Sequence, residues 1–171
     1  MNHAKLLLLA FLLLAASNCF SQWSQQTQTD DSVCVRAALQ DSHVMISDGN
    51  DGAIFFWQDY RNSNYDIYAQ RIDRHGYIKW DTAGVAVSTL SSDQEGPVAI
   101  PDGNGGAVVA WIDYTDYHCY LQHTDSSGNM LWTSGGVQVP FYTDAIYQYN
   151  ISMCNAPGRS TIMAIEYDQI Y

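Results

Sequence analysis

D-G-N-D-G-A-I-F-F-W-Q-D-Y, at residues 48–60, recurs further along the chain as D-G-N-G-G-A-V-V-A-W-I-D-Y, at residues 102–114. Eight of the thirteen aligned positions are identical. Turn residues fall on turn residues and tryptophan falls on tryptophan, which is the pattern of a duplicated structural unit. The sequence therefore predicts tandem copies of one small supersecondary unit.

The repeat extends on both sides of these segments with nearly the same spacing. Gln40, Gln94 and Gln148 align with one another. We expect repeat units at about residues 40–93 and 94–147, and a partial third unit at residues 148–171. Recurring residues are expected to be structural anchors of these units: Trp57, Trp111, Trp80, Trp132, Asp59, Asp113, Asp73, Asp125, Gly76 and Gly128.

Each unit carries four short runs of β-branched and aromatic residues that end at Gly, Asp, Asn or Ser. In the first unit they are residues 44–46, 53–57, 67–72 and 77–80, and a further apolar stretch lies at residues 85–87. Turn residues between the runs suit tight hairpins, and helical periodicity is missing after residue 21. The fold class is therefore all-β, with four-stranded antiparallel meanders.

A single four-stranded sheet needs a packed neighbour to bury both of its faces. Tandem units of about 50 residues therefore predict blades of a β-propeller. Two full units with incomplete ends predict a partial propeller over residues 22–171, and we expect the chain to be a fragment of a longer protein. The incomplete last unit should then expose apolar surface and favour association.

Residues 1–21 are typical of a signal peptide. Lys5 precedes an unbroken apolar run at residues 6–16, which is too short to cross a bilayer, and small residues precede a cleavage point before Gln22. Lipidation at Cys19 is the alternative, although Asn18 is a poor residue to precede it. We expect a secreted protein, extracellular or at the cell surface, with no membrane insertion after signal cleavage.

Composition and cysteine usage narrow the partners. The chain has 18 Asp and Glu against 7 Lys and Arg, a formal net charge of -11, so phosphate backbones would repel it and nucleic acid is excluded.

Cys34, Cys119 and Cys154 allow at most one disulfide and are expected to be buried apolar residues. The loop at residues 48–52 has alternating oxygen ligands but lacks the later Glu of a calcium loop, so we expect a hairpin turn, no metal and no cofactor.

The loop after the second strand of each unit is the candidate binding surface. Rings there would stack on sugar faces, while carboxylates and amides bond to hydroxyl groups. Asp59 and Asp113, two residues after a repeat Trp, are expected to cap the loops instead, and Tyr68 and Tyr120 to pack inside. The candidate ligand-binding residues are Tyr60, Tyr65, Tyr114, Tyr117, Asp93, Glu95 and Arg61.

The pieces A-I-F-F-W-Q-D-Y-R, D-I-Y-A-Q-R-I-D and G-Y-I-K-W, between residues 53 and 80, resemble repeats of large exported bacterial proteins. Many of these proteins end in a sorting domain for type IX secretion, which this sequence does not contain. The resemblance implies an extracellular propeller-like module and no particular reaction.

No nucleophile elbow or phosphate loop is present, and the histidines fall at variable places of the repeat. The sequence therefore favours a non-catalytic binding or adhesion module, for carbohydrate or another cell-surface protein. The alternative is the N-terminal part of a sialidase-like, glycoside-processing propeller. Residues 73–80 are similar to the Asp-box of sialidases but have one more residue between Asp73 and Gly76. Sialidase chemistry also needs a cluster of arginines, and the few arginines of this chain are dispersed along the sequence.

Overall fold

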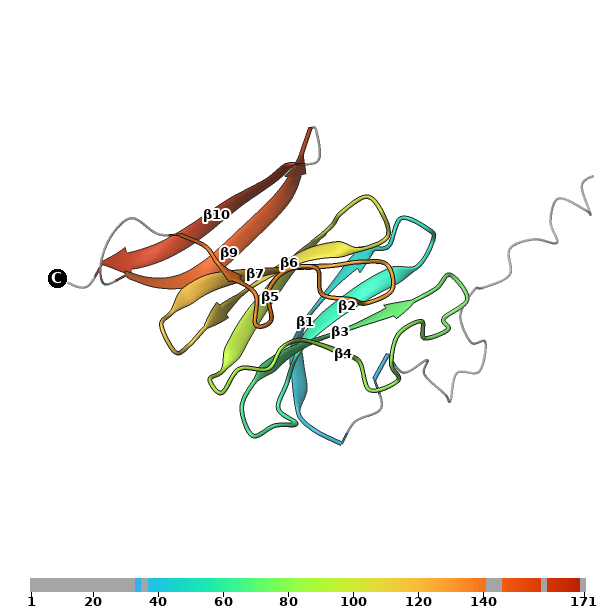
Figure 1. Ribbon diagram of the computed structural model, residues 1–171, viewed down its shortest axis with the longest axis horizontal. Helices are drawn as coiled ribbons and strands as arrows, with labels where there is room; N and C mark the ends of the chain where they lie inside the picture. Colours follow the sequence, from blue (N-terminus) through green and yellow to red (C-terminus); the bar gives the residue numbers. More distant parts are fainter. Residues whose placement is uncertain (1–32, 35–36, 141–145, 158–159, 170–171) are drawn as a thin grey trace, which may run out of the picture. The chain divides into compact units, whose positions relative to one another are not determined.

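The computed structural model describes residues 33–34, 37–140, 146–157 and 160–169, and the regular structure in these ranges consists of β-strands (Figure 1). The predicted signal peptide at residues 1–21 lies outside the described residues. Within the described ranges, no helix has the length and apolar character needed to cross a membrane. The all-β class predicted from the sequence is confirmed.

Two four-stranded antiparallel sheets follow one another along the chain, and a hairpin follows them (Figure 1). In each sheet the strands lie side by side in chain order. The first sheet contains β1 (Gln40–Ser47), β2 (Ala53–Asp59), β3 (Asp66–Ile72) and β4 (Val85–Ser88), the second contains β5 (Gln94–Pro101), β6 (Ala107–Asp113), β7 (His118–Thr124) and β8 (Val137–Gln138), and the hairpin contains β9 (Ile146–Ala156) and β10 (Ser160–Gln169).

The fourth strand differs from the prediction. Residues 77–80 form only an isolated bridge between Ile78 and Ile72, and β4 is the apolar stretch that follows them. The side chain of Gln70 explains the difference, because its Oε1 accepts the backbone N–H of Trp80 at 3.1 Å, where a strand would supply a backbone carbonyl. Gln122 accepts the N–H of Trp132 in the same way, at 3.0 Å.

The turn between the first two strands is closed by an aspartate in each sheet. Asp48 Oδ1 accepts the N–H groups of Asn50 and Gly52, both at 2.8 Å, and Asp102 makes the equivalent bonds in the second sheet. A Cβ at Gly52 would collide with the carbonyl oxygen of Ile72, so only glycine fits there. Asp48 Oδ2 pairs with Arg71, so local donors occupy both oxygens of this carboxylate.

The first strand of each sheet carries a bulge at the same place. The register shifts between Asp41 and Val44 in β1 and between Glu95 and Val98 in β5. The backbone φ is positive at the equivalent residues, 48° at Ser42 and 65° at Gly96. A bulge bends a strand and turns its side chains, so it decides where Asp41 and Glu95 point.

The sheets pack through apolar faces. Ile54 and Phe56 of the first sheet share a buried cluster with Val109 and Trp111 of the second, and a second cluster joins β6 and β7 to β9. Trp57 and Trp111 are both buried, and each stacks on the strand tyrosine beside it, Tyr68 or Tyr120, with ring centroids 6.4 and 6.3 Å apart. The repeat predicted these positions.

Trp80 and Trp132 occupy equivalent positions but differ in burial. Trp80 is 8% exposed, donates its indole N–H to the carbonyl of Ser126 at 3.1 Å and packs against Gly128 of the second repeat. Trp132 is 38% exposed. In the described part of the chain, β9 and β10 are the only strands of the third repeat, so no hairpin equivalent to the one around Gly128 covers Trp132.

Among the described residues the cysteines are free thiols, and the expectation that Cys34, Cys119 and Cys154 are all buried is wrong for two of them. Cys119 is buried, Cys34 is half-buried and Cys154 is exposed. Cys154 is exposed because it lies on the β9–β10 hairpin, which has a packed sheet on one side only.

Candidate functional site

The loops after β2 and β6 each present a pair of tyrosines. The rings of Tyr60 and Tyr65 lie 5.0 Å apart between centroids, and those of Tyr114 and Tyr117 lie 5.1 Å apart. Tyr60 and Tyr114 are each 43% exposed and Tyr117 is 37% exposed, while Tyr65 is half-buried. We call these four residues the tyrosine rim; the sequence predicted all four to be exposed, and this holds for Tyr60, Tyr114 and Tyr117 but not for Tyr65.

Buried aspartates shape these loops, as predicted. Asp59 Oδ1 accepts the N–H of Arg61 at 3.0 Å, and Asp113 Oδ1 accepts the N–H of Thr115 at 2.8 Å. An aspartate that bonds to the backbone two residues later holds a tight turn. Tyr60 and Tyr114, which directly follow these aspartates, therefore lie at the start of a held turn at the end of β2 and of β6.

Backbone hydrogen bonds then tie each loop to two sheets. Tyr114 donates its N–H to the carbonyl of Asp93 at 2.9 Å, and Tyr60 makes the equivalent bond to Leu39. The carbonyl of Tyr65 accepts the N–H of Gln94 at 2.7 Å, at the start of the next sheet. The rim is therefore anchored by the scaffold.

Carboxylates lie among the rings. Asp93 Oδ1 accepts the N–H of Tyr65 at 2.8 Å, and the Tyr65 hydroxyl donates to Asp41 Oδ2 at 3.4 Å. Burial raises the pKa of Glu95, and the negative charges of Asp93 and Asp41 raise it further. Burial likewise raises the pKa of Tyr114, followed by the charge of Glu95. The hydrogen bonds therefore place Asp93 and Asp41 beside Tyr65.

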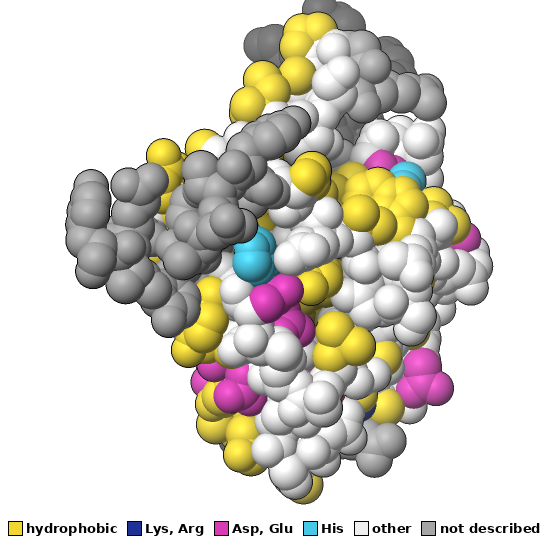
Figure 2. Space-filling view, turned by 60° about the vertical axis from the view of Figure 1, so that its left-hand side comes forward, with side chains coloured by type: hydrophobic (Ala, Val, Ile, Leu, Met, Phe, Trp, Pro, Cys, Tyr) yellow, Lys and Arg dark blue, Asp and Glu magenta, His cyan; other side chains and the backbone are white. Residues whose placement is uncertain are grey.

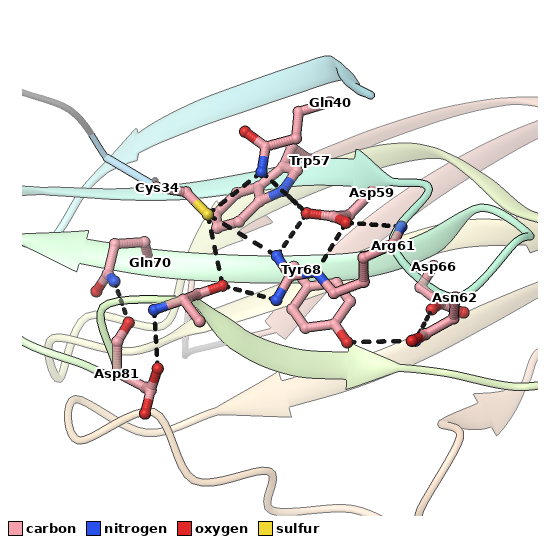
Figure 3. Close-up of polar contacts among 11 residues, drawn as sticks. Cys34, Gln40, Trp57, Asp59, Arg61, Asn62, Asp66, Tyr68, Gln70 and Asp81 are labelled. Atoms are coloured by element: carbon pink, nitrogen blue, oxygen red, sulfur yellow. Dashed lines mark hydrogen bonds and ion pairs between the residues drawn. The ribbon is translucent and has the colours of Figure 1, made fainter. Parts of the chain in front are cut away.

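The structure places Arg61 away from the rim. Its guanidinium donates to both oxygens of Asp59 and to the carbonyl of Ala83, and it lies 3.7 Å above the ring of Tyr68 (Figure 3). Its side chain is only 14% exposed. Arg61 is the counterion of a buried carboxylate, and its predicted contact with a ligand stays a prediction.

Asp59 is the centre of this buried network. It also accepts the indole N–H of Trp57 at 2.9 Å and the side-chain amide of Gln40 at 3.1 Å (Figure 3). Burial favours the neutral acid, but the hydrogen bonds from Arg61 and Trp57 outweigh burial and lower the pKa of Asp59. Thr115 replaces Arg61 in the second repeat, where Ser92 and Gln94 donate to Asp113 instead.

The other recurring aspartates hold turns. Asp73 Oδ1 accepts the N–H groups of His75 and Tyr77, and Asp125 Oδ1 accepts those of Ser127 and Asn129. In the described ranges, no group of three or more His, Cys, Asp or Glu side chains is placed to hold a metal ion. Asp73 and Asp125 therefore hold turns of the scaffold.

Sequence reasoning missed Asp41. It occupies the position of Glu95 one repeat earlier, and Tyr149 occupies the same position one repeat later. Following the repeat spacing through the first strand would have identified both residues. Tyr149 is 54% exposed, so this position is solvent-accessible in the third unit as well.

Negative charge predominates on the described surface. In the part of the chain that the structure describes, no ion pair joins Asp41, Asp93 or Glu95 to a basic side chain. The face drawn in Figure 2 shows acidic side chains next to hydrophobic ones, with Lys and Arg barely visible among its described residues.

The fold and the rim define an all-β protein of tandem four-stranded antiparallel sheets with a repeated, acidic and aromatic loop surface. No family model matches the chain, and neither a curated protein nor a solved structure matches it.

Proposed function

We propose that the chain is an exported, non-catalytic module that binds carbohydrate at the tyrosine rim. The observation that carries this proposal is that Tyr60 and Tyr114 are exposed at equivalent loops of two successive sheets, each in contact with a second tyrosine ring. Large aromatic side chains held at the surface by a rigid scaffold are typical of a binding surface. Tyrosine faces stack on the apolar faces of sugars, and carboxylates accept hydrogen bonds from hydroxyl groups.

We also propose that the sheets are consecutive blades of a β-propeller in an exported repeat protein. Supporting this, each sheet has its strands in chain order, and its apolar face packs on the sheet that follows. The inter-sheet bond that Gln94 N–H donates to the carbonyl of Tyr65 recurs between Gln148 N–H and the carbonyl of Tyr117, as expected of successive blades. An experimental structure in which β1, β5 and β9 do not line a common axis would contradict this part of the proposal.

The sialidase-like alternative receives less support. Sialic acid carries a carboxylate, which an arginine cluster binds. Arg61 is engaged by Asp59 and Arg71 by Asp48, and neither guanidinium belongs to the rim. Arg74 is the remaining arginine of the described residues, and it lies in the turn after β3, beside His75.

A glycan array with the chain from residue 22 onward tests the binding proposal. Tyr60→Ala and Tyr114→Ala should each weaken binding about tenfold, because an aromatic contact contributes roughly 0.5–1.5 kcal/mol beyond the area it buries. Tyr77→Ala is the matched control, since Tyr77 is 69% exposed but lies in the turn after β3. A parent protein that binds no glycan, or two rim variants that bind as tightly as the parent, would remove the rim as a carbohydrate site.

A further inference from the structure

A groove lies beside Trp132, and its counterpart beside Trp80 is filled by the next repeat. We infer that this groove and the open edge of β10 together bind a β-strand followed by an Asp-x-x-Gly turn, supplied by a different polypeptide. The groove lies at the opposite end of β6 from the tyrosine rim, and the inference does not rest on the proposed carbohydrate function.

The contact at Trp80 shows what such a groove accepts. Trp80 donates its indole N–H to the carbonyl of Ser126 at 3.1 Å, and Arg71 donates to the same carbonyl at 2.8 Å. Gly128 packs against the indole ring so closely that a Cβ would come within 2.9 Å of it. A tight turn that ends in glycine therefore covers Trp80.

The equivalent place beside Trp132 is open. The groove there has a volume of about 480 Å³, and Trp132 is 38% exposed. His123 occupies the position of Arg71 in the repeat, and its ring centroid lies 5.7 Å from that of Trp132. Side chains from the second sheet and from the β9–β10 hairpin line the groove, among them Asp102, Asn104, His123, Trp132, Asn155 and Thr161.

The edge of β10 supplies the second half of the site. β2 and β6 are each paired on both sides, whereas β10, the equivalent strand of the third unit, pairs with β9 alone among the described residues (Figure 1). Backbone N–H and C=O groups at a sheet edge can pair with an added strand. β10 is ten residues long and contains neither Lys nor Pro, the residues that commonly protect an edge.

The register of the repeat connects the edge to the groove. Ala107 of β6 pairs with Thr124 of β7, which directly precedes the turn that begins at Asp125. Thr161 of β10 occupies the position of Ala107 and lines the groove. A strand added to β10 in the register of β7 would therefore end opposite Thr161 and place its turn in the groove, against Trp132.

A different polypeptide suits the groove better than a second copy of this chain. The turn at Asp73 follows β3, which is paired with both β2 and β4, and the turn at Asp125 already covers Trp80. A second copy could dock either turn only with its whole sheet, and β9 and β10 already occupy the place that the first two strands of that sheet would need. The partner therefore presents a strand and turn without two strands before them.

The probe for this site is a peptide with the sequence of residues 66–80, which contains one strand of the repeat and the turn that follows it. Calorimetry with the chain from residue 22 onward compares this peptide with a scrambled peptide of the same composition. The scrambled peptide controls for charge attraction to an acidic chain. The parent peptide should bind about tenfold more tightly than the scrambled one or better, because only the parent has the strand and turn in order.

Two changes test the contact with Trp132. Trp132→Ala should weaken binding of the peptide about tenfold or more, whereas Met45→Ala, which removes an exposed apolar side chain from β1, should leave it unchanged. Gly76→Ala in the peptide should weaken binding to the parent chain similarly. Gly76 has a φ of 82°, close to the 87° of Gly128, and a Cβ at this position of the turn would collide with the indole ring.

Equal affinity for the parent and scrambled peptides would overturn the inference, and so would full affinity in both Trp132→Ala and Gly76→Ala. If residues 22–171 formed dimers in sedimentation that Trp132→Ala disrupted, a second copy would fill the groove and the assignment to a different polypeptide would be wrong. The glycan array measures a separate surface, so loss of peptide binding in Trp132→Ala should leave glycan binding intact.

Discussion

Replacement of Asp59 by asparagine is the sharpest test of the buried network, because the second repeat contains its own control. Asp59 is fully buried and bonds to the guanidinium of Arg61, whereas Asp113 is 2% exposed and bonds only to neutral donors. The two side chains share one position in the repeat but differ in their partners. Their variants should therefore differ in stability by the contribution of the ion pair.

The magnitudes follow from these partners. Asp59→Asn leaves the charge of Arg61 unpaired at a side chain that is only 14% exposed, and breaking a buried pair in this way costs about 3 to 5 kcal/mol. Asp113→Asn mismatches neutral hydrogen bonds and should cost about 1 to 2 kcal/mol. Arg61→Thr, which copies Thr115, combined with Asp59→Asn, should recover part of the loss.

Urea unfolding followed by tryptophan fluorescence measures these differences. With a urea m-value of about 2 kcal/mol per molar, the midpoint should fall by roughly 1.5 to 2.5 M for Asp59→Asn and by about 0.5 to 1 M for Asp113→Asn. Equal shifts for the two variants would refute the reasoning. A double variant no more stable than Asp59→Asn would show that the unpaired charge of Arg61 is not the cause.

Lowering the pH should remove the contribution of Asp59 to stability, because the pKa of Asp59 in the folded state lies below its unfolded value of about 3.9. This stabilisation is present above the unfolded pKa and is lost as the pH falls through the folded pKa, and urea midpoints at neutral and acidic pH would show the loss. Gly128→Ala should destabilise the protein by about 2 kcal/mol or more, because a Cβ at this position, where φ is 87°, would lie 2.9 Å from the Trp80 ring. Gly103→Ala has a similar φ but open space around the Cβ, so it should cost only about 1 kcal/mol, and equal losses in stability would contradict this steric account. Burial raises the pKa of the Cys119 thiol to about 12, so mass spectrometry after brief alkylation of the folded protein should find Cys154 labelled and Cys119 intact, and the reverse order would contradict the burial assigned to them. Expression in a secreting host should yield a mature chain that begins at Gln22 by intact-mass analysis, and retention of residues 1–21 would refute the signal peptide.

The repeat made the sheets predictable, because turn residues and tryptophans recur with a fixed period whatever lies between them. It failed at residues 77–80, since a run of alternating apolar residues does not reveal that Gln70 intercepts the backbone N–H of Trp80. Position in a loop also did not show that the Arg61 side chain is mostly buried. Its neighbour Tyr60 faces solvent, but Asp59 draws the guanidinium inward, and sequence spacing alone cannot give the direction of a long side chain.

The bulge in the first strand connects scaffold and surface. A bulge interrupts the hydrogen-bond ladder, and one at the same place in β1 and β5 is better explained as a feature that positions side chains than as a packing defect. In both strands an acidic residue stands directly before the bulge, Asp41 in β1 and Glu95 in β5, and the Tyr65 hydroxyl of the rim donates to Asp41 Oδ2 at 3.4 Å. A regular strand would turn these two side chains in other directions, so the bulge links the course of the first strand to the position of the acidic residue beside the loop surface.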